Sequence, residues 1–90
     1  MPNERRGTVG SVPAEHKVPP DSAFMRTLVR VARREREPRW KTADGERIVV
    51  WDGHHGELEI YNKRGRHLGV LDPETGAMIK GAKAGRKIDV

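Results

Sequence analysis

The chain has 90 residues, which is enough for one domain with a small core. It carries 18 Lys and Arg against 13 Asp and Glu, a net charge of +5, and its pI is close to 10.1. The sequence has no cysteine and no apolar run long enough to cross a membrane, which excludes a disulfide scaffold, a thiolate metal site and a membrane-spanning helix. Its positive charge favours a small soluble domain that binds a polyanion such as a nucleic acid.

The first twenty residues, MPNERRGTVGSVPAEHKVPP, contain four prolines and two glycines and show no apolar period. We expect residues 1–20 to form a flexible N-terminal tail that is mobile or lies extended on the surface. The stretch from Met1 to Ser11 has charges but no apolar centre, so no signal peptide is expected in it. The tail is expected to give way at residue 21 to a domain that occupies residues 21–90.

An apolar stripe at helical spacing follows the tail. Asp21 and Ser22 suit a helix N-cap, and Pro38 is expected to stop the helix. The stripe comprises Phe24, Leu28 and Val31, with Met25, Val29 and Ala32 beside them. The pattern predicts a helix over about residues 21–36, with Arg33 and Arg34 on its solvated face.

From Arg39 onward the apolar period changes to two. Short alternating runs are separated by turn sequences at hairpin spacing, namely 43–45, 53–56, 62–65 and 72–76. In the last clear run, Leu68 and Val70 alternate with His67 and Leu71. The predicted fold class is therefore α+β, with an N-terminal helical segment packed on a twisted antiparallel β-sheet meander of four or five strands.

The acidic side chains are concentrated in the middle of the chain. Residues 40–62 carry five acidic and two basic side chains, whereas residues 1–39 and 63–90 each have a net charge of +4. Within the acidic stretch, the alternation places Glu57, Glu59 and Tyr61 on one face of a strand, opposite Leu58 and Ile60. A domain that only binds phosphates needs no acidic residues between its cations, so phosphate binding alone does not explain these carboxylates.

Asp52, His55 and Glu59 can meet across the hairpin that joins the two runs. RNA carries its own nucleophile, the 2′-hydroxyl, and its cleavage needs a base for the 2′ proton, an acid for the leaving 5′ oxygen and a cation near the phosphate. A carboxylate and an imidazole suit this proton transfer near neutral pH. The set therefore predicts a ribonuclease that needs no metal or other cofactor.

Other interpretations of the same residues stay open. Charged residues on hairpins are mostly solvated, and His54 and His67 are expected to be surface histidines. Trp51 is expected in the core, and Tyr61 either stacks on a base or packs. Asp52, His54 and His55 cluster as metal ligands do, but no cysteine or third nearby histidine completes a zinc set, so no metal site is expected.

Segment 47–72, RIVVWDGHHGELEIYNKRGRHLGVLD, strongly resembles the cytotoxic ribonuclease domain of the ribosome-inactivating colicins and cloacin. The elements that carry the resemblance are Trp-Asp-x-x-His-Gly-Glu-Leu-Glu, a following Tyr, His-Leu-Gly and Asp-Pro-x-Thr-Gly. They cover about half of the chain at fixed spacing. Segment 1–38 carries no motif of this family, and the resemblance weakens toward Arg86.

The resemblance implies that Asp52, His55 and Glu59 are catalytic, together with Arg86. Glu59 would take the 2′ proton and His55 would protonate the leaving oxygen, or the two would exchange roles. Asp52 would orient His55, and Arg86 would stabilise the phosphorane, unless Lys83 or Lys87 does so. The residues expected to contact RNA are Tyr61, Lys63, Arg64, Lys80, Lys83 and Lys87.

The resemblance also implies a target and a partner. The domain would cut 16S ribosomal RNA in the decoding A site of the intact 30S subunit, leave a 2′,3′-cyclic phosphate and stop translation. A cognate acidic immunity protein would bind the domain, which is expected as a monomer or a 1:1 complex. A secreted or delivered toxin of this kind acts in the cytoplasm of a target bacterium.

Three other functions remain open from the sequence. The domain could be a non-catalytic basic module that binds RNA or ribosomes, a general ribonuclease of free RNA, or a metal-dependent nuclease. The presence of new RNA ends, their distribution and their dependence on metal distinguish these alternatives.

Overall fold

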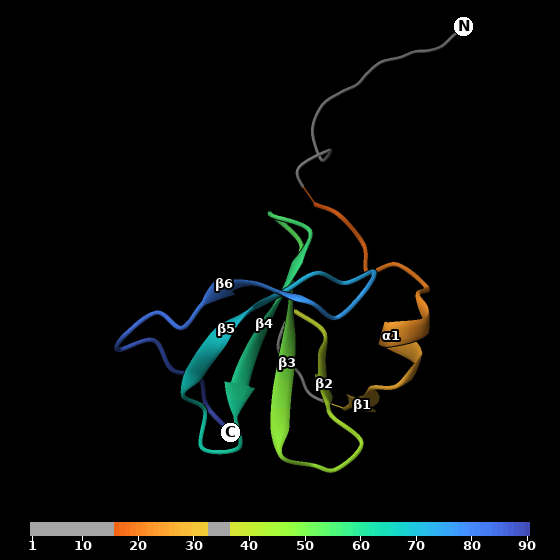
Figure 1. Ribbon diagram of the computed structural model, residues 1–90. Coiled ribbons are helices and arrows are strands. Elements are labelled where there is room, and N and C mark those ends of the chain that lie inside the picture. The colour runs from red at the N-terminus through yellow and green to blue at the C-terminus, as the bar shows by residue number, and fades with distance from the viewer. Residues whose placement is uncertain (1–15, 33–36) are drawn as a thin grey trace, which may run out of the picture.

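The computed structural model describes residues 16–32 and 37–90. Its centre is one antiparallel sheet in which six strands follow one another in chain order (Figure 1). The strands are β1 (Val29–Val31), β2 (Arg39–Lys41), β3 (Arg47–Asp52), β4 (Glu57–Asn62), β5 (His67–Leu71) and β6 (Met78–Gly81). The predicted antiparallel meander is confirmed, and within the described part of the chain it has more strands than the sequence indicated.

The predicted helix over 21–36 is wrong between its first turn and residue 32, and residues 33–36 lie outside the described part of the chain. The only helix among the described residues, α1, spans Ala23–Arg26, and the Ser22 hydroxyl accepts its N-cap bond from the Met25 amide at 3.0 Å. Thr27 ends the helix, since its hydroxyl donates to the Phe24 carbonyl at 2.7 Å. The chain then extends as β1, where β-branched Val29 pairs with Lys41 of β2. The α+β class holds with a minor helical part, while Arg33 and Arg34 lie outside the described residues.

The core lies on one face of the sheet. Val49 stands opposite Ile60 and Trp51 opposite Leu58, so β3 and β4 present these four apolar side chains to the same side. The buried cluster contains Met25, Trp40, Val49, Trp51, Leu58, Ile60 and Leu71. Met25 brings α1 onto this face.

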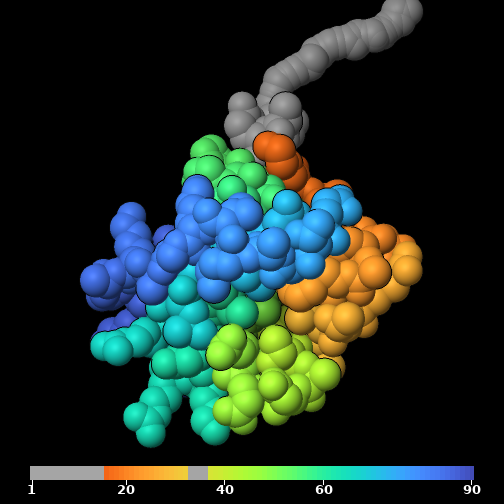
Figure 2. All heavy atoms as spheres, viewed as in Figure 1, coloured from red at the N-terminus to blue at the C-terminus, as the bar shows by residue number. Residues whose placement is uncertain are grey.

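The N-terminal and C-terminal halves meet along one edge of this core. The segment that follows β5 lies against the α1 region, as blue and orange spheres in Figure 2 show. There the Ser22 hydroxyl donates to the Pro73 carbonyl at 2.6 Å. Of the predicted tail, residues 1–15 lie outside the described residues, and residues 16–20 have no regular secondary structure. The backbone amide of Lys17 donates to the Gly53 carbonyl, and the Lys17 carbonyl accepts from the Trp51 indole, both at 2.8 Å. Trp51 is buried, as expected.

The opposite face of the sheet carries ionisable residues among apolar ones. Glu59 lies between Val50 of β3 and Val70 of β5, and Tyr61 lies opposite Ile48, so the predicted alternation along β4 is confirmed. The C-terminal segment covers part of this face. It is held there by bonds from the Ile88 amide to the Gly65 carbonyl (2.9 Å) and from the Arg39 guanidinium to the Asp89 carbonyl (2.7 Å).

A β-bulge changes the direction of side chains at the start of β5. Ile60 pairs with Gly69, but the next residue, Tyr61, pairs with His67, so Leu68 is an extra residue in β5. A bulge of this kind turns a side chain that regular alternation would place on the other face. Leu68 consequently packs toward the core, and His67 shares the face of Tyr61. The expected alternation of Leu68 and Val70 against His67 and Leu71 is therefore wrong at its first two positions.

Candidate active site

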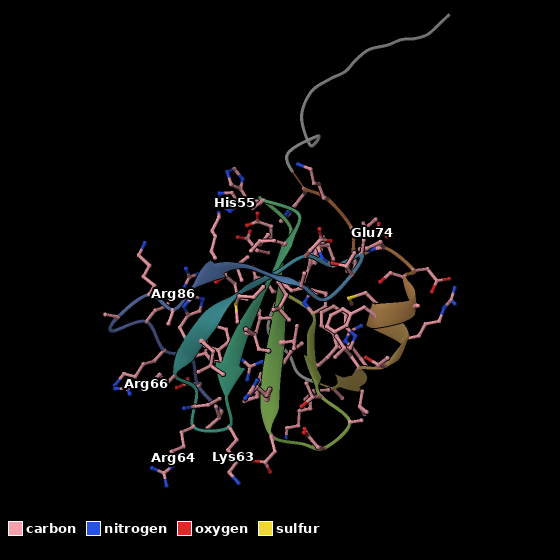
Figure 3. The ribbon with its side chains drawn as sticks, in the orientation of Figure 1. His55, Lys63, Arg64, Arg66, Glu74 and Arg86 are labelled. Carbon is pink, nitrogen blue, oxygen red and sulfur yellow. The ribbon has the colours of Figure 1, made fainter. Side chains whose placement is uncertain are left out.

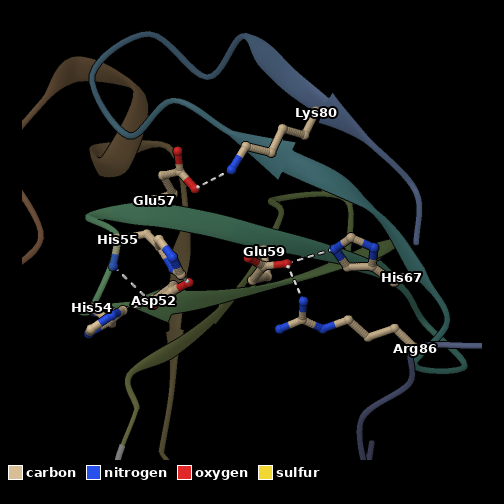
Figure 4. A network of polar contacts seen from close by, with 8 residues as sticks. All are labelled: Asp52, His54, His55, Glu57, Glu59, His67, Lys80 and Arg86. Carbon is tan, nitrogen blue, oxygen red and sulfur yellow. Dashed lines mark hydrogen bonds and ion pairs between the residues drawn. The ribbon is translucent and has the colours of Figure 1, made fainter. Parts of the chain in front are cut away.

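Asp52 and His55 form a carboxylate–imidazole pair at the hairpin between β3 and β4. Asp52 ends β3, and its Oδ2 lies 2.7 Å from Nδ1 of His55 (Figure 4). Its Oδ1 accepts from the backbone amides of His54 and His55 at 3.1 and 3.2 Å. The turn is closed by a bond from the Gly56 amide to the Asp52 carbonyl, with Gly56 at φ 70°. These bonds fix the hairpin so that His55 stays within reach of its carboxylate.

The same contacts set the protonation of Asp52. Partial burial raises its pKa, but the hydrogen bonds from the His55 ring and from the two amides lower it, and the net pKa lies below the usual value of 3.8. The carboxylate is therefore charged at neutral pH and can only accept hydrogen bonds. Nδ1 of His55 must then carry the hydrogen, which leaves Nε2 of this half-exposed ring for a ligand.

Glu59 is the centre of a second, buried group. Its side chain is 8% exposed, and its Oε1 lies 2.7 Å from Nε2 of His67 and 3.6 Å from a guanidinium nitrogen of Arg86 (Figure 4). The His67 ring is 2% exposed, whereas Arg86 is 44% exposed. The prediction that His67 lies on the surface is wrong, because the bulge in β5 turns this residue toward Glu59. Its place could not be read from alternation, which a bulge interrupts.

The four predicted catalytic residues line one cleft of about 260 Å³. Asp52 and His55 reach it from the hairpin, Glu59 from the middle of β4, and Arg86 from the C-terminal segment. The remaining lining residues are Glu57, His67, Val70, Lys80, Gly81 and Lys83. The cleft therefore combines two carboxylate–imidazole pairs with the basic side chains of Lys80, Lys83 and Arg86.

The predicted RNA-binding cations fall into two groups. Lys80 and Lys83 line the cleft, and Lys80 lies 3.5 Å from Glu57. Lys63 and Arg64 lie on the β4–β5 turn, at the opposite end of the sheet from His55 (Figure 3). Lys63 there approaches Glu46 at 3.5 Å. Lys87 lies on the C-terminal segment, where its backbone forms an isolated antiparallel β-bridge with that of Arg66.

Tyr61 and His54 differ in how far they are buried. Tyr61 is 2% exposed, and its ring meets that of His67 edge to face at 5.3 Å between centroids. Burial raises the pKa of the Tyr61 phenol, although the nearby Arg86 lowers it in part. The ring is therefore packed in the protein, and Tyr61 also lines a second cavity together with His54, Glu59 and Arg86. His54 is exposed, as expected, and lies edge to face with His55 at 5.0 Å.

Within segments 16–32 and 37–90, no three His, Cys, Asp or Glu side chains are arranged to hold a metal ion. No helix in the described segments is long and apolar enough to span a membrane.

A single antiparallel sheet with a carboxylate–imidazole cleft, set among cations, defines a small basic domain with a candidate acid–base site. The chain belongs to the Cytotoxic family, which it matches over residues 18–89. It is 47% identical over 51 residues to colicin E3 of Escherichia coli, and 45% identical over 51 residues to colicin-E6 and to cloacin of the same organism. The resemblance stated from the sequence is thereby confirmed. The matched part covers 56% of this chain and 9% of each relative.

Proposed function

We propose that this domain is a metal-independent endoribonuclease toxin that cleaves 16S ribosomal RNA in the decoding A site of the intact ribosome. The observation that carries the proposal is the cleft in which Asp52, His55, Glu59 and Arg86 come together. A carboxylate, an imidazole and a guanidinium are the groups that cleavage by a 2′-hydroxyl requires. Membership in the Cytotoxic family and similarity to colicin E3 and cloacin support the toxin function.

The reaction needs two proton transfers. Glu59 removes the proton of the 2′-hydroxyl while the 2′ oxygen bonds to the neighbouring phosphorus. The bond from phosphorus to the 5′ oxygen breaks, and Nε2 of a protonated His55 gives its proton to that oxygen. The products are a 2′,3′-cyclic phosphate and a free 5′-hydroxyl.

Asp52 and Arg86 would stabilise the charges that the reaction requires. Asp52 holds the ring of His55 through its 2.7 Å contact and stabilises the imidazolium form. Arg86 is 44% exposed, so its guanidinium has surface with which to contact a phosphate in the cleft. Its charge would offset the negative charge that develops on the phosphorane.

The surrounding cations would bind the substrate. Lys80 and Lys83 line the cleft and would neutralise flanking phosphates, which makes binding weaken with added salt. The cations Lys63, Arg64 and Lys87 lie outside this cleft and would contact more distant ribosomal RNA or the partner. An acidic immunity protein fits the net charge of +5. As a secreted or delivered toxin, the domain would act in the cytoplasm of a target bacterium.

The experiment compares intact ribosomes with deproteinised ribosomal RNA. New ends on the small-subunit RNA are mapped by primer extension, with a His55→Ala protein alongside. One strong stop at the decoding site, absent with free RNA and with the variant, supports the proposal. Scattered cuts on free RNA would instead indicate a general ribonuclease, and binding without new ends would indicate a non-catalytic module.

A further inference from the structure

His67 is the most deeply buried ionisable residue that lines the cleft. Its ring is 2% exposed and makes two hydrogen bonds, one through each nitrogen. Nε2 lies 2.7 Å from Oε1 of Glu59, and Nδ1 lies 2.9 Å from the backbone nitrogen of Lys83. Both ring nitrogens are thus committed to the protein, so His67 has none left to exchange protons with a substrate.

The second of these bonds determines which nitrogen carries the hydrogen. A backbone N–H can only donate, so the Lys83 amide requires a lone pair on Nδ1 of His67. The ring hydrogen of the neutral imidazole must then lie on Nε2, where it donates to the Glu59 carboxylate. A hydrogen on Nδ1 would point at the Lys83 N–H and break this bond. The Lys83 amide therefore sets the tautomer that Glu59 requires.

The backbone around His67 is also arranged for this contact. The bulge in β5 turns the side chain onto the face of Glu59, next to the extra residue Leu68. The backbone amide of His67 donates to the Arg86 carbonyl at 3.0 Å. His67 therefore holds the Glu59 carboxylate through its ring and the segment that carries Arg86 through its backbone amide.

We propose that His67 is a positioning residue of the ribonuclease reaction, an inference that rests on the proposed function. As the neutral Nε2–H tautomer, it donates to Oε1 of Glu59 and fixes the rotamer of that carboxylate. We assign Oε2 of Glu59 to accept the 2′ proton. A misplacement of about 1 Å in such a group costs on the order of 10²-fold in rate.

Two substitutions separate the two bonds of the ring. In His67→Asn, the amide oxygen falls near the place of Nδ1 and can accept from Lys83, but nothing donates to Glu59. In His67→Gln, the amide nitrogen falls near the place of Nε2 and can donate to Glu59, but the Lys83 bond is lost. Each full chain is assayed for kcat and KM on intact ribosomes, and its thermal unfolding is measured.

A positioning role predicts that His67→Asn lowers kcat by about 10²-fold with KM unchanged. It predicts that His67→Gln retains kcat within about tenfold of the parent, because the donor to Glu59 is restored. A purely structural role, as an anchor of Lys83, predicts the reverse order. The proposal is overturned if His67→Asn has the kcat of the parent, or if His67→Gln falls as far as His67→Asn.

Nitrogen NMR of the ring in the unmodified protein gives a second test that needs no variant and no cleavage. A hydrogen on Nε2 and a free lone pair on Nδ1 at neutral pH support the proposal, and the opposite tautomer or a doubly protonated ring overturns it. If the parent leaves ribosomal RNA uncut, the proposed function fails by itself, while the NMR result still reports on the contact between His67 and Glu59.

Discussion

Substitution of Glu59 by Gln separates catalysis from stability. Gln has the shape of Glu and keeps an oxygen that accepts the hydrogen of His67 Nε2, which Glu59 accepts at 2.7 Å. It loses the charge and the basic oxygen. Positioned proton transfer contributes ~10²–10⁴-fold, so kcat should fall by that factor, or by about 3–5 kcal/mol in activation free energy.

The expected change in the free energy of unfolding is much smaller. The ion pair lost in Glu59→Gln joins Oε1 to Arg86 at 3.6 Å, and Arg86 is 44% exposed. Such a pair contributes about 0–1 kcal/mol, which corresponds to a shift in Tm of less than about 8 °C. Glu59→Ala serves as the contrast, because it leaves the buried N–H of His67 without an acceptor and should cost ~1–3 kcal/mol from this source.

The assay combines single-turnover cleavage of ribosomes with thermal unfolding of the same preparations. Glu59→Gln should show a large loss of rate and a small loss of stability. Cleavage within tenfold of the parent would show that Glu59 does not accept the proton. A loss of stability above that of Glu59→Ala would show that the glutamine does not keep the hydrogen bond with His67.

Three further predictions address the protonation of Asp52, the C-terminal segment and the cations. The pKa of Asp52 in the folded protein lies below 3.8, so its charge stabilises the fold above that pH, and this contribution is lost as the pH falls through the lower folded pKa. In urea unfolding between ~pH 5 and ~pH 2, the free energy of unfolding should therefore fall less for Asp52→Asn than for the parent. Parallel curves for the two proteins would contradict this. Gly65→Ala, at φ 91°, adds a Cβ against the Ile88 carbonyl and should lower Tm and cleavage more than Gly45→Ala, at φ 75° with open space around it; equal losses would refute the clash. For the binding of an RNA fragment in the cleft, Lys80→Gln should reduce the slope of log affinity against log salt by about 1. Lys63→Gln should leave this binding unchanged. Equal slopes in the two variants would contradict the prediction.

The sheet could be predicted from the sequence because its strands alternate and its turns contain glycine and proline at hairpin spacing. The same alternation placed Glu59 on the face opposite Leu58 and Ile60, as observed. The helix could not be delimited, because Phe24, Leu28 and Val31 fit a helical stripe as well as a short helix followed by a strand. The pairing of Val29 with Lys41 decides between them, and it depends on residues distant in the chain.

The candidate site was predictable where it is local. Asp52 and His55 are three residues apart on one hairpin, so their contact depends on the turn alone. His67 was not predictable from alternation, because the bulge at Leu68 reverses the side on which it lies. The family resemblance indicated Arg86, but its place depends on contacts with β5 such as the bond from the His67 amide.

The chemical nature of the new RNA ends decides whether the 2′-hydroxyl is the nucleophile. Ribosomes are treated in ordinary magnesium buffer, and the fragment ends of the small-subunit RNA are analysed with Glu59→Gln as the control. We expect one cut that leaves a 2′,3′-cyclic phosphate and a 5′-hydroxyl, both absent with the variant. A 3′-hydroxyl with a 5′-phosphate would mean attack by water and would contradict cleavage by the 2′-hydroxyl in the cleft of Asp52, His55, Glu59 and Arg86.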